Sequence, residues 1–381
     1  MAGIKKLLLV CGEASGDLHA AHLVRHIKSL RPEVEITAVG GELLAREGAE
    51  IFFPIKELSV IGLFDVIKKL PVFLSLKKTI LTKIASGQFD GLILVDFSGF
   101  NLRLAAAVNK RIPVIYYISP QVWASRPGRI RSIKKYVSKM IVLFRFEEQF
   151  YKKHGVSAEW VGHPLLDIVK PEIKKEALLS SIKLTPAKTT LALLPGSRAG
   201  EVQRMLPLML SAARLLSHEV PLQTLIAKST SVDWEIYKAA IGPYAPEARI
   251  IEGKTYDCLG AADCAIVASG TATLEAAILG KPFVIVYTMG MLNYLLYRPQ
   301  VKVPYIGIVN IAAGERIIPE FIQHQASPRR IAREIAGILG SQQEQTRIKE
   351  SLSRLKNSLG DKGAGLRAAE AIIRHLESCP S

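Results

Sequence analysis

Short apolar runs alternate with longer stretches of helical periodicity along most of this chain. Alternation of this kind is typical of βαβ units, in which parallel strands form one sheet and helices cover it. In the first half, the pattern predicts strands at 4–11, 91–95, 114–118 and 140–144, and helices at 18–30, 102–110 and 147–154. We therefore expect an α/β domain with a doubly wound parallel sheet.

The alternation of strands and helices is interrupted near 160–166 and in a charged stretch at 170–176, and it resumes after that stretch. The second half predicts strands at 189–194, 222–227, 265–268 and 283–287, helices at 201–216 and 271–279, and amphipathic helix from Pro328 onward. A chain of 381 residues also exceeds the usual ceiling for a single core. We therefore predict an N-terminal domain at 1–165, a C-terminal domain at 166–359, and a last helix at about 360–381 that can pack back on the first domain.

The chemistry is expected in loops that follow strands, because ligands of open α/β sheets bind there and two facing domains enclose a cleft. The first such loop reads Cys-Gly-Glu-Ala-Ser-Gly-Asp. Its glycines allow close approach of a ligand, and its serine or aspartate can cap the next helix. A capped turn without a ligand explains the same residues. The candidate contacts are Gly12, Glu13, Ser15, Gly16 and Asp17.

Two loops of the second half have the features of a nucleoside diphosphate site. The loop after 189–194 offers helix-terminal amides, a hydroxyl and a guanidinium for a diphosphate. The loop after 265–268 offers hydroxyls and a carboxylate that can accept both hydroxyls of a ribose. A plain Pro-Gly turn and a glutamate favoured by the helix dipole are the alternatives. The candidate contacts are Gly196, Ser197, Arg198, Ser269, Gly270, Thr271, Thr273 and Glu275.

Asp96 ends a strand whose other residues are apolar. A general base needs such a rigid position facing the cleft, although an aspartate here can also simply cap a turn. After the next strand, Gln121, Trp123 and Arg126 add an aromatic face and a cation, which suit a phosphorylated sugar. A tryptophan more often serves packing.

The composition favours an anionic partner and no metal. The formal charge of +16 suits a nucleotide, an acidic membrane or nucleic acid. The four cysteines lack CxxC spacing, which favours a reducing compartment. His19, His22 and His26 share a helical face without a carboxylate or cysteine to complete a metal site, so we expect a solvated face. We predict neither a metal nor a cofactor.

Membrane contact is expected to be peripheral. The apolar run at the N-terminus is too short for a signal peptide, and no uncharged stretch approaches the roughly 18 residues that span a bilayer. The segment 58–81 has too many apolar residues for one buried stripe and carries pairs of lysines, so we predict that it faces a membrane, with Phe73 and Leu76 among the inserted side chains. Packing on the first sheet is the alternative.

In this order, the motifs resemble the lipid-A-disaccharide synthase family. The resemblance runs through Gly12-Glu-Ala-Ser-Gly-Asp17, Asp96 with Phe100-Asn101-Leu-Arg-Leu-Ala105, Ser119-Pro-Gln-Val-Trp-Ala124, Val161-Gly-His-Pro164, Leu194-Pro-Gly-Ser-Arg198 and Ser269-Gly-Thr-Ala-Thr-Leu-Glu275, up to Asn310. It implies the GT-B fold, with two Rossmann-like domains facing a central cleft, and adds Asn101 and Asn310 to the candidate contacts. Some relatives carry a second Asp where this chain has Gly99, and a second Trp where it has Ser125.

The resemblance also implies a reaction. UDP-2,3-diacylglucosamine is the donor, 2,3-diacylglucosamine 1-phosphate (lipid X) is the acceptor, and inversion gives the β-1′,6-linked lipid A disaccharide and UDP. Asp96 would accept the proton of the acceptor 6-hydroxyl, and Arg198 and Ser197 would stabilise the departing UDP. Such an enzyme works in the cytoplasm, peripherally on the anionic inner face of the inner membrane, and a homodimer is left open.

Three other functions are compatible with part of the sequence. The peptidoglycan N-acetylglucosaminyltransferase shares the GT-B fold but is expected to open with Gly-Gly-x-Gly-Gly-His, which this chain lacks. A nucleic-acid-binding protein would exploit the positive charge, but the chain has no clustered basic repeats, RNP-type aromatics or zinc module. A non-catalytic sugar-nucleotide sensor would bind UDP without turnover.

Overall fold

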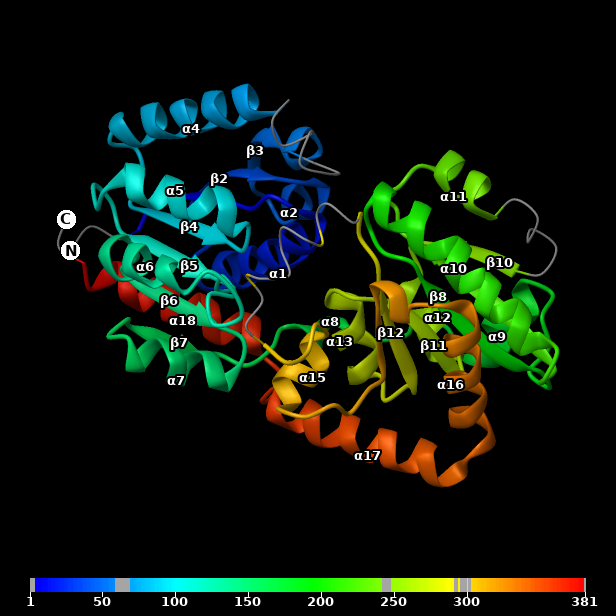
Figure 1. Cartoon of the computed structure of the whole chain (residues 1–381). Helices are drawn as coiled ribbons and strands as arrows, with labels where there is room; N and C mark the ends of the chain where they lie inside the picture. The colour runs from blue at the N-terminus through cyan, green and yellow to red at the C-terminus, as the bar shows by residue number, and fades with distance from the viewer. Residues whose placement is uncertain are drawn as a thin grey trace. The chain divides into compact units, whose positions relative to one another are not determined.

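The computed structural model describes residues 4–58, 69–241, 248–290, 294, 300 and 303–379 (Figure 1). The chain divides into two compact units. The first unit comprises Met1–Asp167, Gln300–Lys302 and Leu359–Ser381, and the second comprises Ile168–Pro299 and Val303–Ser358. Each unit contains one parallel sheet, so the predicted α/β class with two doubly wound sheets is confirmed.

The first unit has a seven-stranded parallel sheet in the order β3-β2-β1-β4-β5-β6-β7. Its strands are β1 (Lys6–Val10), β2 (Glu35–Gly40), β3 (Glu50–Pro54), β4 (Gly91–Val95), β5 (Val114–Tyr117), β6 (Lys139–Val142) and β7 (Ala158–Trp160). The central strands are continuous apolar runs because helices cover both faces of the sheet. The chain passes from β1 outward to β3 and then returns to place β4 beside β1, so the strand order reverses between β1 and β4.

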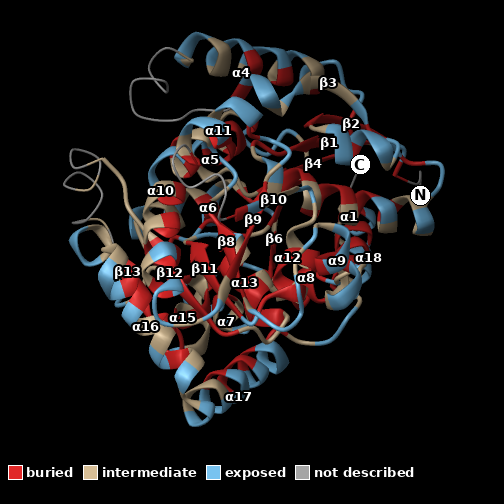
Figure 2. Ribbon diagram, turned by 90° about the vertical axis from the view of Figure 1, so that its right-hand side faces the viewer, coloured by how far each residue is buried: buried red, intermediate tan, exposed pale blue. Residues whose placement is uncertain are grey.

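Helices cover both faces of the first sheet. They are α1 (Ala14–Leu30), α2 (Glu42–Arg46), α4 (Leu70–Ala85), α5 (Ser98–Val108), α6 (Ile130–Tyr136), α7 (Arg145–Lys153), α8 (Leu165–Ile168) and α18 (Ala364–Glu377), with short 3-10 turns η1 (Ile55–Leu58) and η2 (Pro127–Arg129). Apolar side chains of α1 and α18 form the core on one face, and those of α4, α5 and α6 form the core on the other. Figure 2 shows the resulting buried layer along the strands.

The last helix, α18, packs against α1 although the two are far apart in sequence (Figure 1). The backbone N–H of Gly363 donates to the carboxylate of Asp167 at 2.9 and 3.0 Å and fixes the start of α18. A Cβ on Gly365 would lie 2.5 Å from Nδ1 of His22, so the two helices meet closely. The predicted solvated face of the α1 histidines is therefore wrong: His19 is buried with its ring beside that of His163, and α18 packs against His22 and His26.

The second unit has a six-stranded parallel sheet in the order β10-β9-β8-β11-β12-β13. Its strands are β8 (Thr189–Leu194), β9 (Leu222–Lys228), β10 (Ala248–Glu252), β11 (Cys264–Ala268), β12 (Phe283–Tyr287) and β13 (Glu320–Ile322). Its helices are α9 (Lys175–Ser181), α10 (Ala199–Ser217), α11 (Trp234–Ile241), α12 (Thr255–Ala261), α13 (Thr271–Ile278), α15 (Ile308–Ala313), α16 (Pro328–Gly340) and α17 (Gln342–Ser358), with the 3-10 turn η5 (Gln323–Gln325). The strand order reverses between β8 and β11.

No helix in the described part of the chain has the length and apolar character needed to cross a bilayer.

Candidate functional site

In each unit, two of the loops singled out in the sequence lie at the point where the strand order reverses. The loop from Cys11 to Asp17 follows β1 and Asp96 follows β4, and these two strands pair in parallel. In the second unit, the loop with Arg198 follows β8 and the loop with Glu275 follows β11, and these strands also pair in parallel. Doubly wound sheets bind ligands at this reversal, outside the carboxyl ends of the strands. In each unit, the two predicted loops therefore lie together at the position where doubly wound sheets bind ligands.

Asp96 is held in a strained backbone conformation. Asp96 and Phe97 both have a φ of 46°, in the left-handed region that L-residues rarely occupy. Each such residue costs about 1–3 kcal/mol, and such strain persists only where the surroundings enforce it, often at active sites. Here the Asp96 N–H donates to the carbonyl of Tyr117 at 3.1 Å, and the Tyr116 hydroxyl donates to the Asp96 carbonyl. The half-buried Asp96 is thus fixed at the end of β4.

The Asn101 side chain is directed into the protein. It is fully buried, and Nδ2 donates to the carbonyl oxygens of Val10, Val95 and Asp96 at 3.4, 3.3 and 2.9 Å. Asn101 therefore ties the ends of β1 and β4 together and helps to hold Asp96. The contact of Asn101 with substrate stays a prediction.

The first loop packs against the Asp96 loop. Gly12 is buried, and a Cβ there would lie 2.3 Å from the Phe97 ring, so only glycine fits under that ring. Asp17 was predicted to cap the helix that follows or to touch a ligand, but its carboxylate accepts from the N–H groups of Gly41 and Leu43 at 2.7 and 3.1 Å. It therefore caps α2, a different helix, and burial raises its pKa. The remaining loop residues differ in exposure, with Glu13 and Ser15 half-buried and Gly16 buried.

The loop that carries Trp123 is organised by Glu147, which the sequence analysis did not single out. The buried Glu147 carboxylate accepts from the Ser119 hydroxyl at 2.6 Å and from Trp123 Nε1 at 3.1 Å. It also accepts from the N–H of Phe144 at 3.1 Å, and burial raises its pKa. A glutamate three residues into a helix start is the signal that predicts such a cap. Trp123 is thus fixed in orientation, while Gln121 beside it is exposed.

Arg126 lies at the start of the short turn η2 with its side chain exposed. Its φ of 53° is left-handed, as are those of Asp96, Phe97 and Ile118 in the same unit. Its Nε donates to Oε1 of Gln300 at 2.8 Å, a residue of the same unit. Arg126 thus belongs to the segment that follows β5, and Asp96 follows the neighbouring parallel strand β4, so both come after the carboxyl ends of their strands.

The loop after β8 already contains a carboxylate. Glu201 accepts from the Ser197 N–H at 3.3 Å and from Nη1 of Arg198 at 3.2 Å. Gly196 has a φ of 113°, and a Cβ there would lie 2.4 Å from Glu201. Arg198 is the N-cap of α10, and both Ser197 and Arg198 are exposed. The donors predicted for a diphosphate are thus grouped at this helix start, where Glu201 takes two of them.

In the loop after β11, Glu275 is the residue with a shifted titration. Glu275 is half-buried, accepts from the Tyr256 hydroxyl at 3.2 Å, and has its pKa raised to about 7 by burial. Tyr256 was missed because nothing near it in the sequence points to this contact. Ser269 is half-buried, and Gly270 and Thr271 are exposed.

Two predicted contacts of the second unit are directed inward. Thr273 is buried, and its hydroxyl donates to the Gly270 carbonyl at 2.8 Å. Asn310 is fully buried: Nδ2 donates to the Ile318 carbonyl and to Glu320, each at 2.8 Å, and Oδ1 accepts from the N–H groups of Ile317 and Ile318. The side chains of Thr273 and Asn310 thus have partners within the second unit, and their contacts with a ligand stay predictions.

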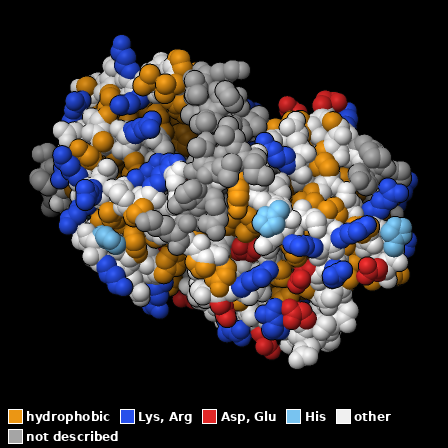
Figure 3. All heavy atoms as spheres, in the orientation of Figure 1, with side chains coloured by type: hydrophobic (Ala, Val, Ile, Leu, Met, Phe, Trp, Pro, Cys, Tyr) orange, Lys and Arg blue, Asp and Glu red, His pale blue; other side chains and the backbone are white. Residues whose placement is uncertain are grey.

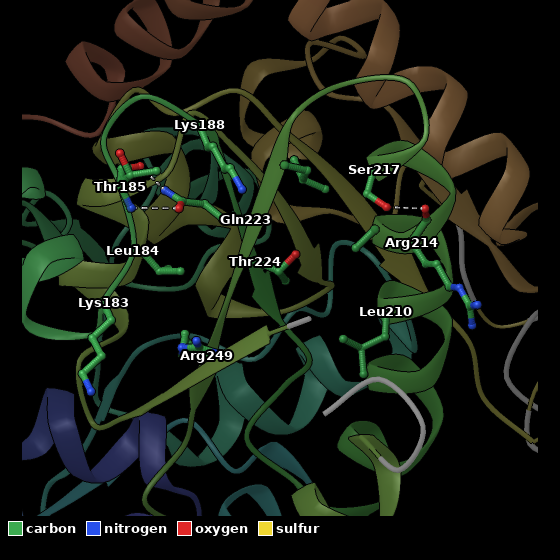
Figure 4. A pocket seen from close by; sticks show the side chains of 12 residues that line it. Lys183, Leu184, Thr185, Lys188, Leu210, Arg214, Ser217, Gln223, Thr224 and Arg249 are labelled. Atoms are coloured by element: carbon green, nitrogen blue, oxygen red, sulfur yellow. Dashed lines mark hydrogen bonds between the residues drawn. The ribbon is translucent and has the colours of Figure 1, made fainter. Parts of the chain in front are cut away.

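A basic pocket of about 450 Å³ lies away from these loops, at the opposite end of the second sheet (Figure 4). It is formed by the starts of β9 and β10, the end of α10 and the segment before β8. Four cations line it, namely Lys183, Lys188, Arg214 and Arg249. None of the predicted site residues belongs to it.

No group of three His, Cys, Asp or Glu side chains in the described ranges is arranged to hold a metal ion.

The predicted membrane segment 58–81 lies partly outside the described residues, which omit 59–68. Its described part belongs mainly to α4. Leu76 is 1% exposed, and Phe73 is half-buried against the rings of Phe97 and Phe100 at 6.1 and 6.0 Å. The predicted insertion of Phe73 and Leu76 is therefore wrong, because both pack on the first sheet. Leu70 and Leu74, at 45% and 58% exposure, are the apolar side chains that α4 leaves to solvent.

Comparisons with known proteins agree on one family. The family model described as lipid-A-disaccharide synthetase matches residues 7–372. The lipid-A-disaccharide synthase of Syntrophus aciditrophicus is 44% identical over 368 residues, which cover 96% of each chain. That of Myxococcus xanthus is 38% identical over 378 residues, which cover 99% of each chain.

Solved structures show the fold. A UDP-GlcNAc 2-epimerase from Neisseria meningitidis, bound to UDP-GlcNAc, matches with a TM-score of 0.68 at 10% identity over 97% of this chain and 100% of that chain. A calicheamicin glycosyltransferase matches with a TM-score of 0.61 at 17% identity over 100% of both chains. Both have the arrangement of two parallel α/β units seen here. The chain therefore belongs to the lipid-A-disaccharide synthase family of glycosyltransferases, with a GT-B-like fold.

Proposed function

We propose that the chain transfers 2,3-diacylglucosamine from UDP to the 6-hydroxyl of 2,3-diacylglucosamine 1-phosphate, with inversion, and so forms the lipid A disaccharide of lipopolysaccharide. The proposal assigns the acceptor to the first unit and the donor to the second. The observation that carries it is the placement of Asp96 at the reversal of the first sheet. Its backbone is strained, and three hydrogen bonds hold it: the Asp96 carbonyl accepts from Asn101 and Tyr116, and its N–H donates to the Tyr117 carbonyl.

Asp96 acts as the general base in this proposal. A base that accepts the proton of an attacking hydroxyl must be positioned within hydrogen-bond reach of it on a rigid element. The end of β4 is such an element, because its strand is fully buried and paired on both sides. Asn101 and Tyr116 act as positioning residues, since both donate to the Asp96 carbonyl. Gln121, Trp123 and Arg126 line the acceptor side.

The second unit binds UDP in this proposal. Arg198 and Ser197, with the first amides of α10, carry the diphosphate and stabilise the charge that grows on it as the sugar leaves. Glu201 now accepts from the Ser197 N–H and from Arg198, so an incoming diphosphate takes over donors that a carboxylate holds in its absence. Glu275 accepts the ribose hydroxyls, and the exposed Gly270 and Thr271 lie in the same loop. No residue of this mechanism requires a metal ion.

We further propose that the protein works in the cytoplasm, bound peripherally to the anionic inner face of the inner membrane. Figure 3 shows basic side chains mixed with hydrophobic ones over the part of the first unit that α4 occupies in Figure 1. Leu70 and Leu74 are exposed there, together with Lys78 of the same helix, and Lys77 is half-buried. Exposed leucines flanked by lysines suit the boundary between headgroups and acyl chains.

The proposed function is tested by mass spectrometry of products. Purified protein with UDP-2,3-diacylglucosamine and lipid X should yield a tetraacyl disaccharide 1-phosphate and one UDP per disaccharide. UDP release without the disaccharide, or no reaction of this donor, would refute the proposed reaction. Omission of lipid X is the control for hydrolysis of the donor.

A further inference from the structure

Three arginines of the first unit, Arg103, Arg126 and Arg129, belong to neighbouring elements beside the Asp96 loop. Arg129 is half-buried, and its Nη1 donates to the hydroxyl of Ser98 at 3.2 Å. Ser98 is the first residue of α5 and follows Asp96 in the same loop. Partial burial lowers the pKa of Arg129, and the nearby charges of Arg126 and Arg103 lower it further. Arg126 precedes the turn η2 and Arg129 ends it, η2 leads into α6, and α6 packs against α5, the helix that carries Arg103.

Such a cluster is costly unless an anion joins it. Like charges repel, and the repulsion is stronger where one of them is partly removed from water. In the described part of the chain, neither Arg103 nor Arg129 forms an ion pair with a carboxylate. Arg126 adds backbone strain, since its φ of 53° lies in the left-handed region. Strain and crowding of cations at one place are features of a built anion site.

The cluster is also placed correctly relative to the proposed base. Arg129 is hydrogen-bonded to Ser98, two residues after Asp96, and its positive charge opposes the rise that burial causes in the pKa of the Tyr116 phenol. The Tyr116 hydroxyl in turn donates to the Asp96 carbonyl. The cations thus begin next to the base and extend toward α6. Figure 3 shows basic side chains gathered over this part of the unit.

An acceptor with a hydroxyl and a phosphate at opposite ends of one sugar ring fits this arrangement. The 6-hydroxyl has to reach Asp96, so the phosphate at C1 has to lie one ring away. A phosphomonoester carries a charge of about −1.5 to −2 near pH 7 and three acceptor oxygens. Guanidinium groups bind such oxygens two at a time, which a lysine ammonium does not do.

We propose that Arg103, Arg126 and Arg129 form the subsite for the anomeric phosphate of the acceptor and thereby select a phosphorylated sugar. This assignment rests on the proposed function of the site. It extends that function, because it names the groups that distinguish a sugar 1-phosphate from the same sugar with a free anomeric hydroxyl. Ser98 fixes the Arg129 side chain for this role.

The test compares two acceptors, lipid X and the same diacylglucosamine without its phosphate. The unchanged protein should use the unphosphorylated acceptor with a kcat/KM lower by roughly 10- to 100-fold, as the loss of a charge-assisted contact predicts. In Arg129→Gln, kcat/KM for lipid X should fall by a similar factor, while the value for the unphosphorylated acceptor stays unchanged. Arg131→Gln is the matched control, because Arg131 is an exposed residue of α6 outside the cluster. It should alter neither value.

Equal losses with both acceptors in Arg129→Gln would overturn the subsite, because they would show a general effect on the fold or on Asp96. Equal use of both acceptors by the unchanged protein would also overturn it. If no disaccharide forms with either acceptor, the proposed function fails. Calorimetry with glucosamine 1-phosphate and glucosamine then decides the subsite separately. Preference for the phosphate that Arg129→Gln removes supports it, and equal binding of the two refutes it.

Discussion

The ring of Phe97 fills the space that a side chain on Gly12 would need: a Cβ on Gly12 would lie 2.3 Å from the ring, closer than any real contact. Gly12 ends the turn after β1 and Phe97 follows Asp96 after β4, so this contact joins the two loops at the reversal of the first sheet. The glycine is required for space and not for its backbone angle, because its φ is not positive.

Gly12→Ala should therefore move the Phe97 ring and disturb Asp96 beside it. We expect destabilisation of about 1–3 kcal/mol, the usual cost of overpacking, together with a loss of turnover. Thermal unfolding and disaccharide formation measure the two effects. Phe97→Leu should relieve part of the clash, so the double variant should lose less stability than the sum of the single variants. Additive losses would show that the two residues do not act through each other.

Asp96→Asn should lower turnover by roughly 10²-fold or more, because the amide cannot accept the proton of the attacking hydroxyl. Its UDP affinity should remain near that of the unchanged protein. Arg198→Ala gives the contrasting result, since loss of a charge-assisted contact should weaken UDP binding by about 1.5–3 kcal/mol. Calorimetry with UDP and steady-state rates separate the two. Turnover of Asp96→Asn close to normal would exclude Asp96 as the base.

Glu275 should make UDP binding dependent on pH. Burial raises its pKa to about 7, so below that pH the side chain becomes neutral and a weaker acceptor for ribose hydroxyls. UDP affinity should fall as the pH drops from 8 to 6 by up to about tenfold per unit. In Glu275→Gln this dependence should shrink to that of the UDP phosphate itself, which titrates near pH 6. Equal pH profiles of the two proteins would remove Glu275 from the ribose site.

The same pKa shift predicts an effect on stability without ligand. The folded-state pKa exceeds the ordinary value of 4.5. The contribution of Glu275 to the free energy of unfolding is therefore fully present below about pH 4.5 and is lost as the pH rises through 7. The difference in melting temperature, Glu275→Gln minus unchanged protein, should therefore be more positive at pH 8 than at pH 5. Thermal unfolding at the two pH values checks the sign.

The exposed face of α4 should carry the membrane contact. Leu70→Ser with Leu74→Ser should reduce sedimentation with vesicles of phosphatidylglycerol and spare the melting temperature, because both side chains are exposed. Leu76→Ser is the matched control and should lower the melting temperature, since Leu76 is buried in the core. Unchanged vesicle binding of the double variant would mean that α4 does not hold the protein to the membrane.

Most interior strands could be predicted from the sequence, whereas the edge strands and the interior strand β2 could not. The bounds of β4, β8 and β12 agree with the predicted ranges, because each is a short, mostly apolar and buried run of β-forming residues. Strands β10 and β13 contain charged residues and lie at the two edges of the second sheet, where partial exposure removes the apolar signal. The fold class needed only the central strands.

The loops of the site could be predicted, but the direction of single side chains could not. The loops stand out because small and polar residues follow buried runs. Asn101 and Asn310 have the same polar character as a ligand contact, yet their partners are backbone groups that only the folded chain brings near, such as Val10 for Asn101. Glu147 is the opposite case: the sequence did not single it out, because its contact with Ser119 joins residues 28 positions apart.

The packing of α18 on α1 has a consequence for the order in which the chain acquires its structure during synthesis. The segment Ile168–Ser358 of the second unit leaves the ribosome before Ala364–Glu377, which supplies Ala368, Ile372 and Leu376 to the core of the first unit. Domains generally fold as units as they emerge. The second unit can therefore complete its core while the first still exposes the apolar side of α1. The unit that begins the chain is the last to be finished.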